Sequence, residues 1–210
     1  MTSRRRPQIA TRKQPQQARS ASLVSAILQA AVQVLAEEGV TRFTTARVAE
    51  KAGVSVGSLY QYFPNKSAIL FRLQIDEWQE TTDMLRAILE DVSQPPLVRL
   101  RTLVHAFIRS ECEEAPVRIA LNDAAPLYRD APEAQQARMA ADRTMALFMQ
   151  ELLPEAPAAT RQRVTELITT TFSAVGSRFS ETPRTPAEIA AWADALTDMF
   201  CAYLRELQQR

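Results

Sequence analysis

Apolar side chains recur every three to four residues along most of the chain, which is the period of a helix with one buried face. No stretch has the β-branched, alternating pattern that is typical of a half-buried strand. We therefore expect an all-α protein of about nine helices. The pattern predicts long helices over about 20–38, 65–92, 96–112, 132–153, 158–179 and 186–208, short ones over 44–52 and 55–63, and a further segment over 116–123.

The two short helices have well-defined ends. Thr44 and Ser55 can each accept a hydrogen bond from the first turn of the helix that follows. Gly53, in the AGVS turn between the helices, suits a left-handed backbone conformation, and Pro64 ends the second helix. Two short helices joined by such a turn predict a helix-turn-helix, a unit that usually places its second helix in the major groove of DNA.

The distribution of charge supports a polyanion-binding end. The 210 residues carry a net charge of only +1, but residues 1–66 hold ten basic side chains against three acidic ones. Residues 1–18 are rich in Arg, Gln, Pro and Ser without apolar periodicity, so they are expected to form a disordered basic arm. The arm is interpreted either as a solvated tail or as a segment that contacts DNA.

Several chemistries have little support in the sequence. His105 is the only histidine, Cys112 and Cys201 lie far apart without CxxC spacing, and no phosphate-binding glycine loop occurs. We therefore expect no metal, no cofactor and no enzyme, although a pair of carboxylates from separate helices stays open. Residues 21–36 carry a polar stripe, which favours an amphipathic helix over a signal peptide or a membrane span, and a cytoplasmic protein is expected.

The stretch FTTARVAEKAGVSVGSLYQYFPNKSAIL resembles the DNA-binding domain of the TetR family of bacterial transcriptional regulators. The resemblance covers about residues 20–70. It implies a helix-turn-helix domain over 19–66, after the arm, and an effector-binding and dimerisation domain over 67–210. The matching residues are Thr44, Ala49, Ala52, Gly53, Val54, Ser55, Gly57, Leu59, Tyr60, Tyr62, Phe63 and Lys66.

The resemblance also implies which residues face DNA. Gln61 suits adenine and Val56 suits a thymine methyl group, whereas the tyrosines suit phosphates; for Tyr60 a ring packed at the domain surface is the alternative. Arg47 stands where the family often has an acidic residue, so a phosphate contact becomes possible there. The candidate DNA-binding residues are Thr44, Thr45, Ala46, Arg47, Ser55, Val56, Gly57, Ser58, Tyr60, Gln61, Tyr62 and Lys66.

For the second domain the resemblance implies a small-molecule pocket and a dimer interface made by the last two helices. The candidate ligand-binding residues are Trp78, Leu85, His105, Phe107, Cys112, Asn122, Tyr128, Met145 and Phe148, for each of which a purely structural role in the core is the stronger alternative. The candidate interface residues are Val164, Leu167, Ile168, Thr171, Phe172, Val175, Phe179, Leu196, Met199, Phe200, Tyr203, Leu204 and Leu207, with an intramolecular core as the alternative.

The sequence thus predicts a homodimeric, ligand-responsive regulator, most often a repressor in this family, that binds a pseudo-palindromic operator and is released by a small, largely apolar ligand. A helical small-molecule-binding or interaction module that does not bind operator DNA is the alternative. The positive charge of residues 1–66 argues against that alternative.

Overall fold

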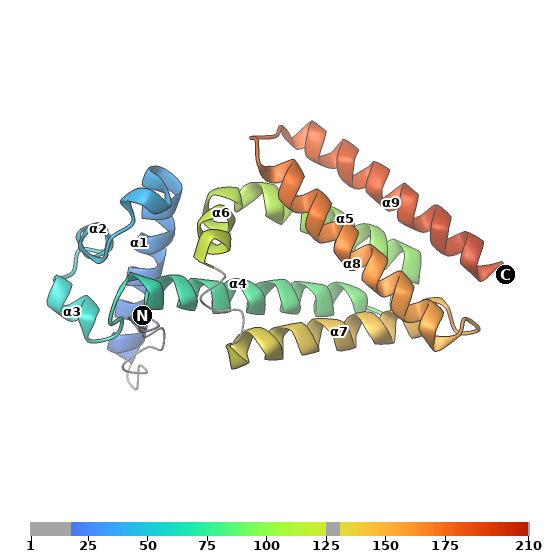
Figure 1. Cartoon of the computed structure of the whole chain (residues 1–210), viewed down its shortest axis with the longest axis horizontal. Helices are drawn as coiled ribbons and strands as arrows, with labels where there is room; N and C mark the ends of the chain where they lie inside the picture. Colours follow the sequence, from blue (N-terminus) through green and yellow to red (C-terminus); the bar gives the residue numbers. More distant parts are fainter. Residues whose placement is uncertain (1–17, 125–130, 210) are drawn as a thin grey trace, which may run out of the picture. The chain divides into compact units, whose positions relative to one another are not determined.

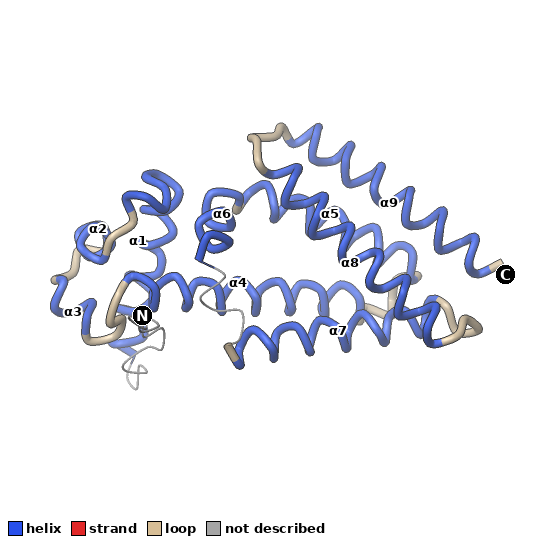
Figure 2. Tube along the Cα trace, viewed as in Figure 1, coloured by secondary structure: helices blue, strands red, loops and turns tan. Residues whose placement is uncertain are grey.

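The computed structural model describes residues 18–124 and 131–209. Within these ranges it contains only helices, joined by loops and turns, as expected for an all-α protein (Figures 1 and 2). The expected arm, apart from its last residue, and the candidate ligand residue Tyr128 lie outside the described ranges. The helices are α1 (Ala18–Arg42), α2 (Thr45–Lys51), α3 (Val56–Tyr60), α4 (Lys66–Leu89), α5 (Pro96–Glu113), α6 (Ala115–Ala124), α7 (Pro132–Leu152), α8 (Ala158–Ser180) and α9 (Pro186–Gln208).

The chain divides into two compact units. Unit 1 comprises the described residues up to Trp78 together with those between Pro116 and Ala134, and unit 2 comprises the rest. Unit 1 therefore extends to Trp78, beyond the domain boundary expected at residue 66. The first half of α4 and all but the first residue of α6 belong to unit 1, because Ile69 of α4 and Leu121 of α6 are buried in the same apolar cluster as Phe63.

The core of unit 1 is built around α1. Ile27, Ala31 and Val34 are fully or almost fully buried, and so is Phe43, which follows the helix. Gly39 interrupts the helical geometry with φ 73° and ψ 173°, a backbone conformation that glycine adopts at little cost. The stretch Ser20–Arg42 is long and apolar enough to cross a membrane by length and composition alone, but its apolar face supplies much of this core.

In unit 2, α5 packs against both α8 and α9. The α5–α8 crossing is close at Gly176, where an added Cβ would lie 2.9 Å from carbon atoms of both Phe107 and Glu111. The capping box expected at the start of α9 is present: the Glu188 amide donates to the Thr185 hydroxyl, and the Thr185 amide donates to the Glu188 carboxylate at 2.8 Å. The Thr185 amide and the Thr185 hydroxyl, which both donate to the carboxylate at 2.8 Å, hold the pKa of Glu188 below its ordinary value.

Half of the expected dimer interface is instead core of unit 2. A helix has one face toward its own core, and the apolar stripes of α8 and α9 largely occupy that face. Leu167 and Met199, by contrast, are about half exposed, at 50% and 51%. The candidate interface residues that are buried within the unit are Val164, Ile168, Phe172, Phe179, Leu196, Phe200 and Leu204.

Candidate DNA-binding and ligand-binding sites

The helix-turn-helix has the local structure that the sequence predicts. The Thr44 hydroxyl accepts a hydrogen bond from the Arg47 amide at 3.3 Å, and the Ser55 hydroxyl accepts one from the Ser58 amide at 3.0 Å. Gly53 has a φ of 67°, and its amide donates to the Glu50 carbonyl at 3.0 Å. Two capped helices joined by this turn present α3 at the surface of unit 1 (Figure 1).

Most of the candidate DNA-binding residues lie at the surface of unit 1. Val56 and Tyr60, on α3, are 38% and 40% exposed, and Gln61 beside them is exposed as well. Tyr62 is the exception, because its side chain is only 7% exposed and its ring packs in the core of the unit. The expectation that the Tyr62 ring faces outward is therefore wrong. The remaining candidates, Thr44, Thr45, Ala46, Arg47, Ser55, Gly57, Ser58 and Lys66, are exposed or half-buried.

Two hydroxyl groups connect the helices of the motif. Thr45 Oγ1 on α2 and the Tyr60 hydroxyl on α3 lie 3.0 Å apart and are hydrogen-bonded. Each hydroxyl has both donor and acceptor capacity, so the pair retains groups that can bind an oxygen of an incoming ligand. The Tyr60 ring is half exposed and its hydroxyl is directed at α2, an arrangement that fits both the phosphate contact and the ring packed at the domain surface.

The two basic side chains of α2 are paired with acidic residues of α1. Arg47 forms an ion pair with Glu38, and Lys51 Nζ lies 2.8 Å from Glu37 Oε2. All four residues are at least partly exposed, so both pairs are accessible to solvent and salt. The positive charge of α2 is thus partly neutralised in the free protein.

Unit 2 contains an apolar cavity of about 110 Å³ between α4, α5, α7 and α8. Three candidate ligand residues line it: Leu85, Phe107 and Met145. Six further residues line the cavity that the sequence does not predict as ligand-binding. Those on α4 and α8 have the helical i, i+3, i+4 spacing, which could have identified them as one face of each helix. They are Thr81, Met84, Leu103, Thr169, Phe172 and Ser173.

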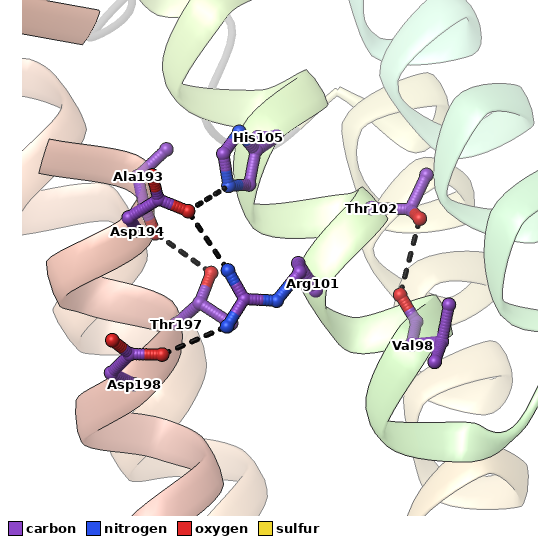
Figure 3. A network of polar contacts seen from close by, with 8 residues as sticks. All are labelled: Val98, Arg101, Thr102, His105, Ala193, Asp194, Thr197 and Asp198. Atoms are coloured by element: carbon purple, nitrogen blue, oxygen red, sulfur yellow. Dashed lines mark hydrogen bonds and ion pairs between the residues drawn. The ribbon is translucent and has the colours of Figure 1, made fainter. Parts of the chain in front are cut away.

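The other candidate ligand residues whose side chains the structure describes lie elsewhere. His105 Nε2 is 3.1 Å from Asp194 Oδ1 on α9, in a surface network in which Arg101 binds both Asp194 and Asp198 at 2.8 Å (Figure 3). The His105 ring therefore connects α5 to α9 and does not line the cavity.

Packing accounts for three more of these candidates. Trp78 packs against the core of unit 1, whereas Cys112 and Phe148 belong to the core of unit 2. Burial raises the pKa of the Cys112 thiol, which makes it a poor nucleophile. The side chain of Asn122 lies outside the described residues. No cluster of three or more His, Cys, Asp or Glu that could bind a metal ion occurs in the described parts of the chain.

Comparisons with known proteins agree with this arrangement. Residues 27–73 match the family model described as bacterial regulatory proteins, tetR family, and residues 95–207 match that of the tetracyclin repressor-like C-terminal domain. The nucleoid occlusion factor SlmA of Vibrio campbellii is 38% identical over 84 residues, which cover 39% of this chain and 42% of SlmA. The chain thus spans less than half of the length of that curated relative.

Two solved structures share the fold. A TetR-family transcriptional regulator from Mesorhizobium loti has a TM-score of 0.66 at 21% identity, covering 89% of this chain and 98% of its own. The TetR-family repressor FadR of Thermus thermophilus, in complex with lauroyl-CoA, has a TM-score of 0.57 at 18% identity, covering 85% and 93%. Because the C-terminal family model alone spans more than half of the chain, the protein belongs to the TetR family of bacterial regulatory proteins.

Proposed function

We propose that this protein is a homodimeric transcriptional repressor that binds a pseudo-palindromic operator and is released by a small, largely apolar ligand. The observation that carries the proposal is the exposed surface of α2 and α3, on which capped helix ends, hydroxyl groups and a glutamine lie together. Such a surface offers donors for phosphates and a side chain for base edges. The protein acts by binding rather than by catalysis.

On this surface the residues divide into two roles. The hydroxyl groups of Thr45 and Tyr60, together with the exposed Lys66, position the protein on the phosphate backbone. Gln61 and Val56 reach base edges, since an amide pairs with adenine and an apolar side chain contacts the thymine methyl group. Gly57, on the exposed side of α3, lets the backbone approach DNA closely.

Dimerisation follows from the symmetry that such an operator requires. Two copies of α3 related by a two-fold axis reach successive major grooves when they lie about 34 to 36 Å apart. The side chains of α8 and α9 that remain available to a second copy include Leu167, Trp192 and Met199, each about half exposed. This exposed set replaces the buried half of the interface that the sequence predicts.

The cavity in unit 2 is the proposed ligand site. It is lined mainly by apolar side chains with a few hydroxyl groups, the composition that suits a small organic molecule. The relative from Thermus thermophilus is a repressor in complex with an acyl-CoA, which supports a ligand-responsive role for this chain. A ligand can release DNA only if it binds the DNA-free conformation more tightly than the DNA-bound one.

A gel-shift with the DNA upstream of the protein's own gene tests this function. We expect salt-sensitive binding that prefers this DNA over a shuffled sequence of equal composition, together with a dimer in analytical ultracentrifugation. The alternative, a helical module that does not bind operator DNA, predicts equal and weak binding to both sequences. That outcome would leave the cavity as the site of a different function.

A further inference from the structure

The cavity in unit 2 offers a ligand almost nothing with which to form a hydrogen bond. Among the nine described residues that line it there is no charged side chain, and the surface that they present is almost wholly apolar. A polar group that loses its hydration against such walls gains no partner in exchange, which costs free energy. The walls therefore favour a guest without polar atoms.

The hydroxyl-bearing residues of α8 in the walls do not change this character. Thr169 Oγ1 donates to the Thr165 carbonyl at 2.9 Å and lies 3.3 Å from the Glu166 carbonyl, so its hydrogen bonds are made within its own helix. Ser173, one turn further along α8, is exposed, so its hydroxyl group can stay hydrated at the mouth of the half-open cavity. One hydroxyl group is thus used by the backbone and the other is accessible to water.

The size of the cavity limits the ligand to a compact molecule. Its volume is about 110 Å³, which is comparable with an engineered apolar cavity of about 150 Å³ that binds benzene. Met84 and Met145 are flexible wall residues that can adjust to a somewhat larger guest. One ring with a small substituent therefore fits, whereas a long acyl chain requires a rearrangement of the walls.

Two of the wall residues are aromatic, and packing holds their rings in place. Phe107 and Phe172 contact each other edge to face, with ring centroids 5.2 Å apart. Phe172 also packs against Phe200 of α9, at 5.3 Å between centroids. A flat ring can extend this arrangement, and methionine sulfur makes favourable contacts with aromatic edges. The walls thus suit an aromatic hydrocarbon.

We propose that the ligand of this cavity is a compact, uncharged aromatic hydrocarbon that is held by packing alone, without a hydrogen bond to the walls. The inference rests on the proposed function and names the ligand class of the same site. The apolar walls stabilise the bound ring by removing it from water. A hydroxyl or carboxylate group added to the ring should therefore weaken binding, because it loses hydration and gains no partner.

Isothermal titration calorimetry of the full-length protein with three compounds that share one ring and one methyl group tests the proposal. We expect toluene to bind with one site per chain, 4-methylphenol to bind at least about fivefold more weakly, and 4-methylbenzoate to bind more weakly still. Binding of either polar compound as tightly as toluene overturns the inference. So does the failure of toluene to bind up to its solubility limit.

Spectra of protein labelled with ¹³C in the methionine methyl groups show where toluene binds. Met84 and Met145 line the cavity, so the ring current of a bound toluene molecule should shift the signals of both. Met139, which is 68% exposed on α7, is the control for adsorption at the surface. A shift of the Met139 signal without shifts of the other two would place the compound outside the cavity and contradict the inference.

Matched variants test the assignment to the cavity. Leu85→Phe places a larger side chain in the wall and should weaken toluene binding at least about fivefold. Leu97→Phe is the control, since Leu97 is also a half-buried leucine of unit 2 but does not line the cavity. Thr169→Val should leave the affinities for toluene and 4-methylphenol unchanged, because the Thr169 hydroxyl group is used within α8. Equal toluene affinities of the two phenylalanine variants, or loss of 4-methylphenol binding in Thr169→Val, contradict the inference.

Gel-shifts with the same protein preparations separate this inference from the proposed function. Operator binding in the absence of ligand is expected for the wild type and for all three variants, because the changed residues belong to unit 2. Intact operator binding without binding of toluene overturns only the ligand class. Binding of toluene by a wild-type protein that shows no operator preference supports the ligand class and overturns the proposed function.

Discussion

The hydroxyl groups of Thr45 and Tyr60 are hydrogen-bonded to each other at 3.0 Å, which connects the first helix of the helix-turn-helix to the second. We propose that this pair holds one phosphate oxygen of the operator. Tyr60→Phe should then weaken operator binding about fivefold, the effect of one hydrogen bond, with only a small decrease in melting temperature because the lost bond to Thr45 is exposed. Fluorescence anisotropy with labelled operator measures the affinity, and unchanged affinity would contradict a phosphate contact by this hydroxyl group.

Tyr62 differs from Tyr60 because its ring is buried, so its replacement should act through stability. Tyr62→Ala removes a packed ring from the core of unit 1 and should lower the free energy of unfolding by about 3 kcal/mol. Thermal unfolding followed by circular dichroism measures this loss, and Tyr62→Phe, which keeps the ring, is the control. A normal melting temperature for Tyr62→Ala would show that the ring contributes little to the core.

Two glycines allow a close approach in different places. Gly57 has open space around it, with only Ser55 Oγ at 3.8 Å from an added Cβ, whereas at Gly176 the added atom would lie 2.9 Å from side-chain carbons of α5. Gly57→Ala should therefore lower operator affinity several-fold without destabilising the protein. Gly176→Ala should destabilise it by about 1 to 3 kcal/mol without a direct effect on DNA contacts.

Paired measurements of melting temperature and operator affinity separate these effects. Each glycine variant serves as the control for the other. If Gly57→Ala bound the operator normally, the backbone of α3 would not approach DNA closely at this point.

The ion pair between Glu38 and Arg47 should compete with DNA for the arginine. Glu38→Gln frees the guanidinium group, so binding to non-specific DNA should tighten and its dependence on salt should become steeper by about 0.9 in the log–log slope, the value for one more phosphate contact. Anisotropy titrations at several salt concentrations measure the slope. Glu90→Gln makes the same charge change in unit 2 and serves as the control; weaker binding by Glu38→Gln would mean that Glu38 positions Arg47 for DNA instead.

The sequence predicts the helices well because their ends are encoded locally. Thr44, Ser55 and Thr185 accept the cap hydrogen bonds that their residue types suggest, and Gly53 has the expected positive φ. The candidate DNA-binding residues come from the resemblance to the TetR family, and most of them are exposed or half-buried, since a five-residue helix leaves little choice of which side chains are exposed.

Properties that depend on tertiary packing are predicted less well. The side chain of Tyr62 is buried because the turn after α3 directs it into the core that α1 and α4 complete, and this cannot be read from its neighbours in sequence. Periodicity identifies an apolar stripe on α8 but not what covers it, so it places Phe172 in the expected dimer interface although Phe172 lines the cavity. Similarly, His105 is held at the surface by Asp194, a residue 89 positions later in the chain.

Whether α3 reads DNA sequence is tested by selection of binding sites from random DNA at about physiological salt, by the wild type and by Gln61→Ala. The wild type should enrich a pseudo-palindrome whose half-sites are centred about one helical turn, or a multiple of it, apart. Gln61→Ala should keep that spacing but lose preference at one position of each half-site, at a cost of about 1 to 3 kcal/mol. A wild-type protein that enriched no sequence would contradict sequence reading by α3.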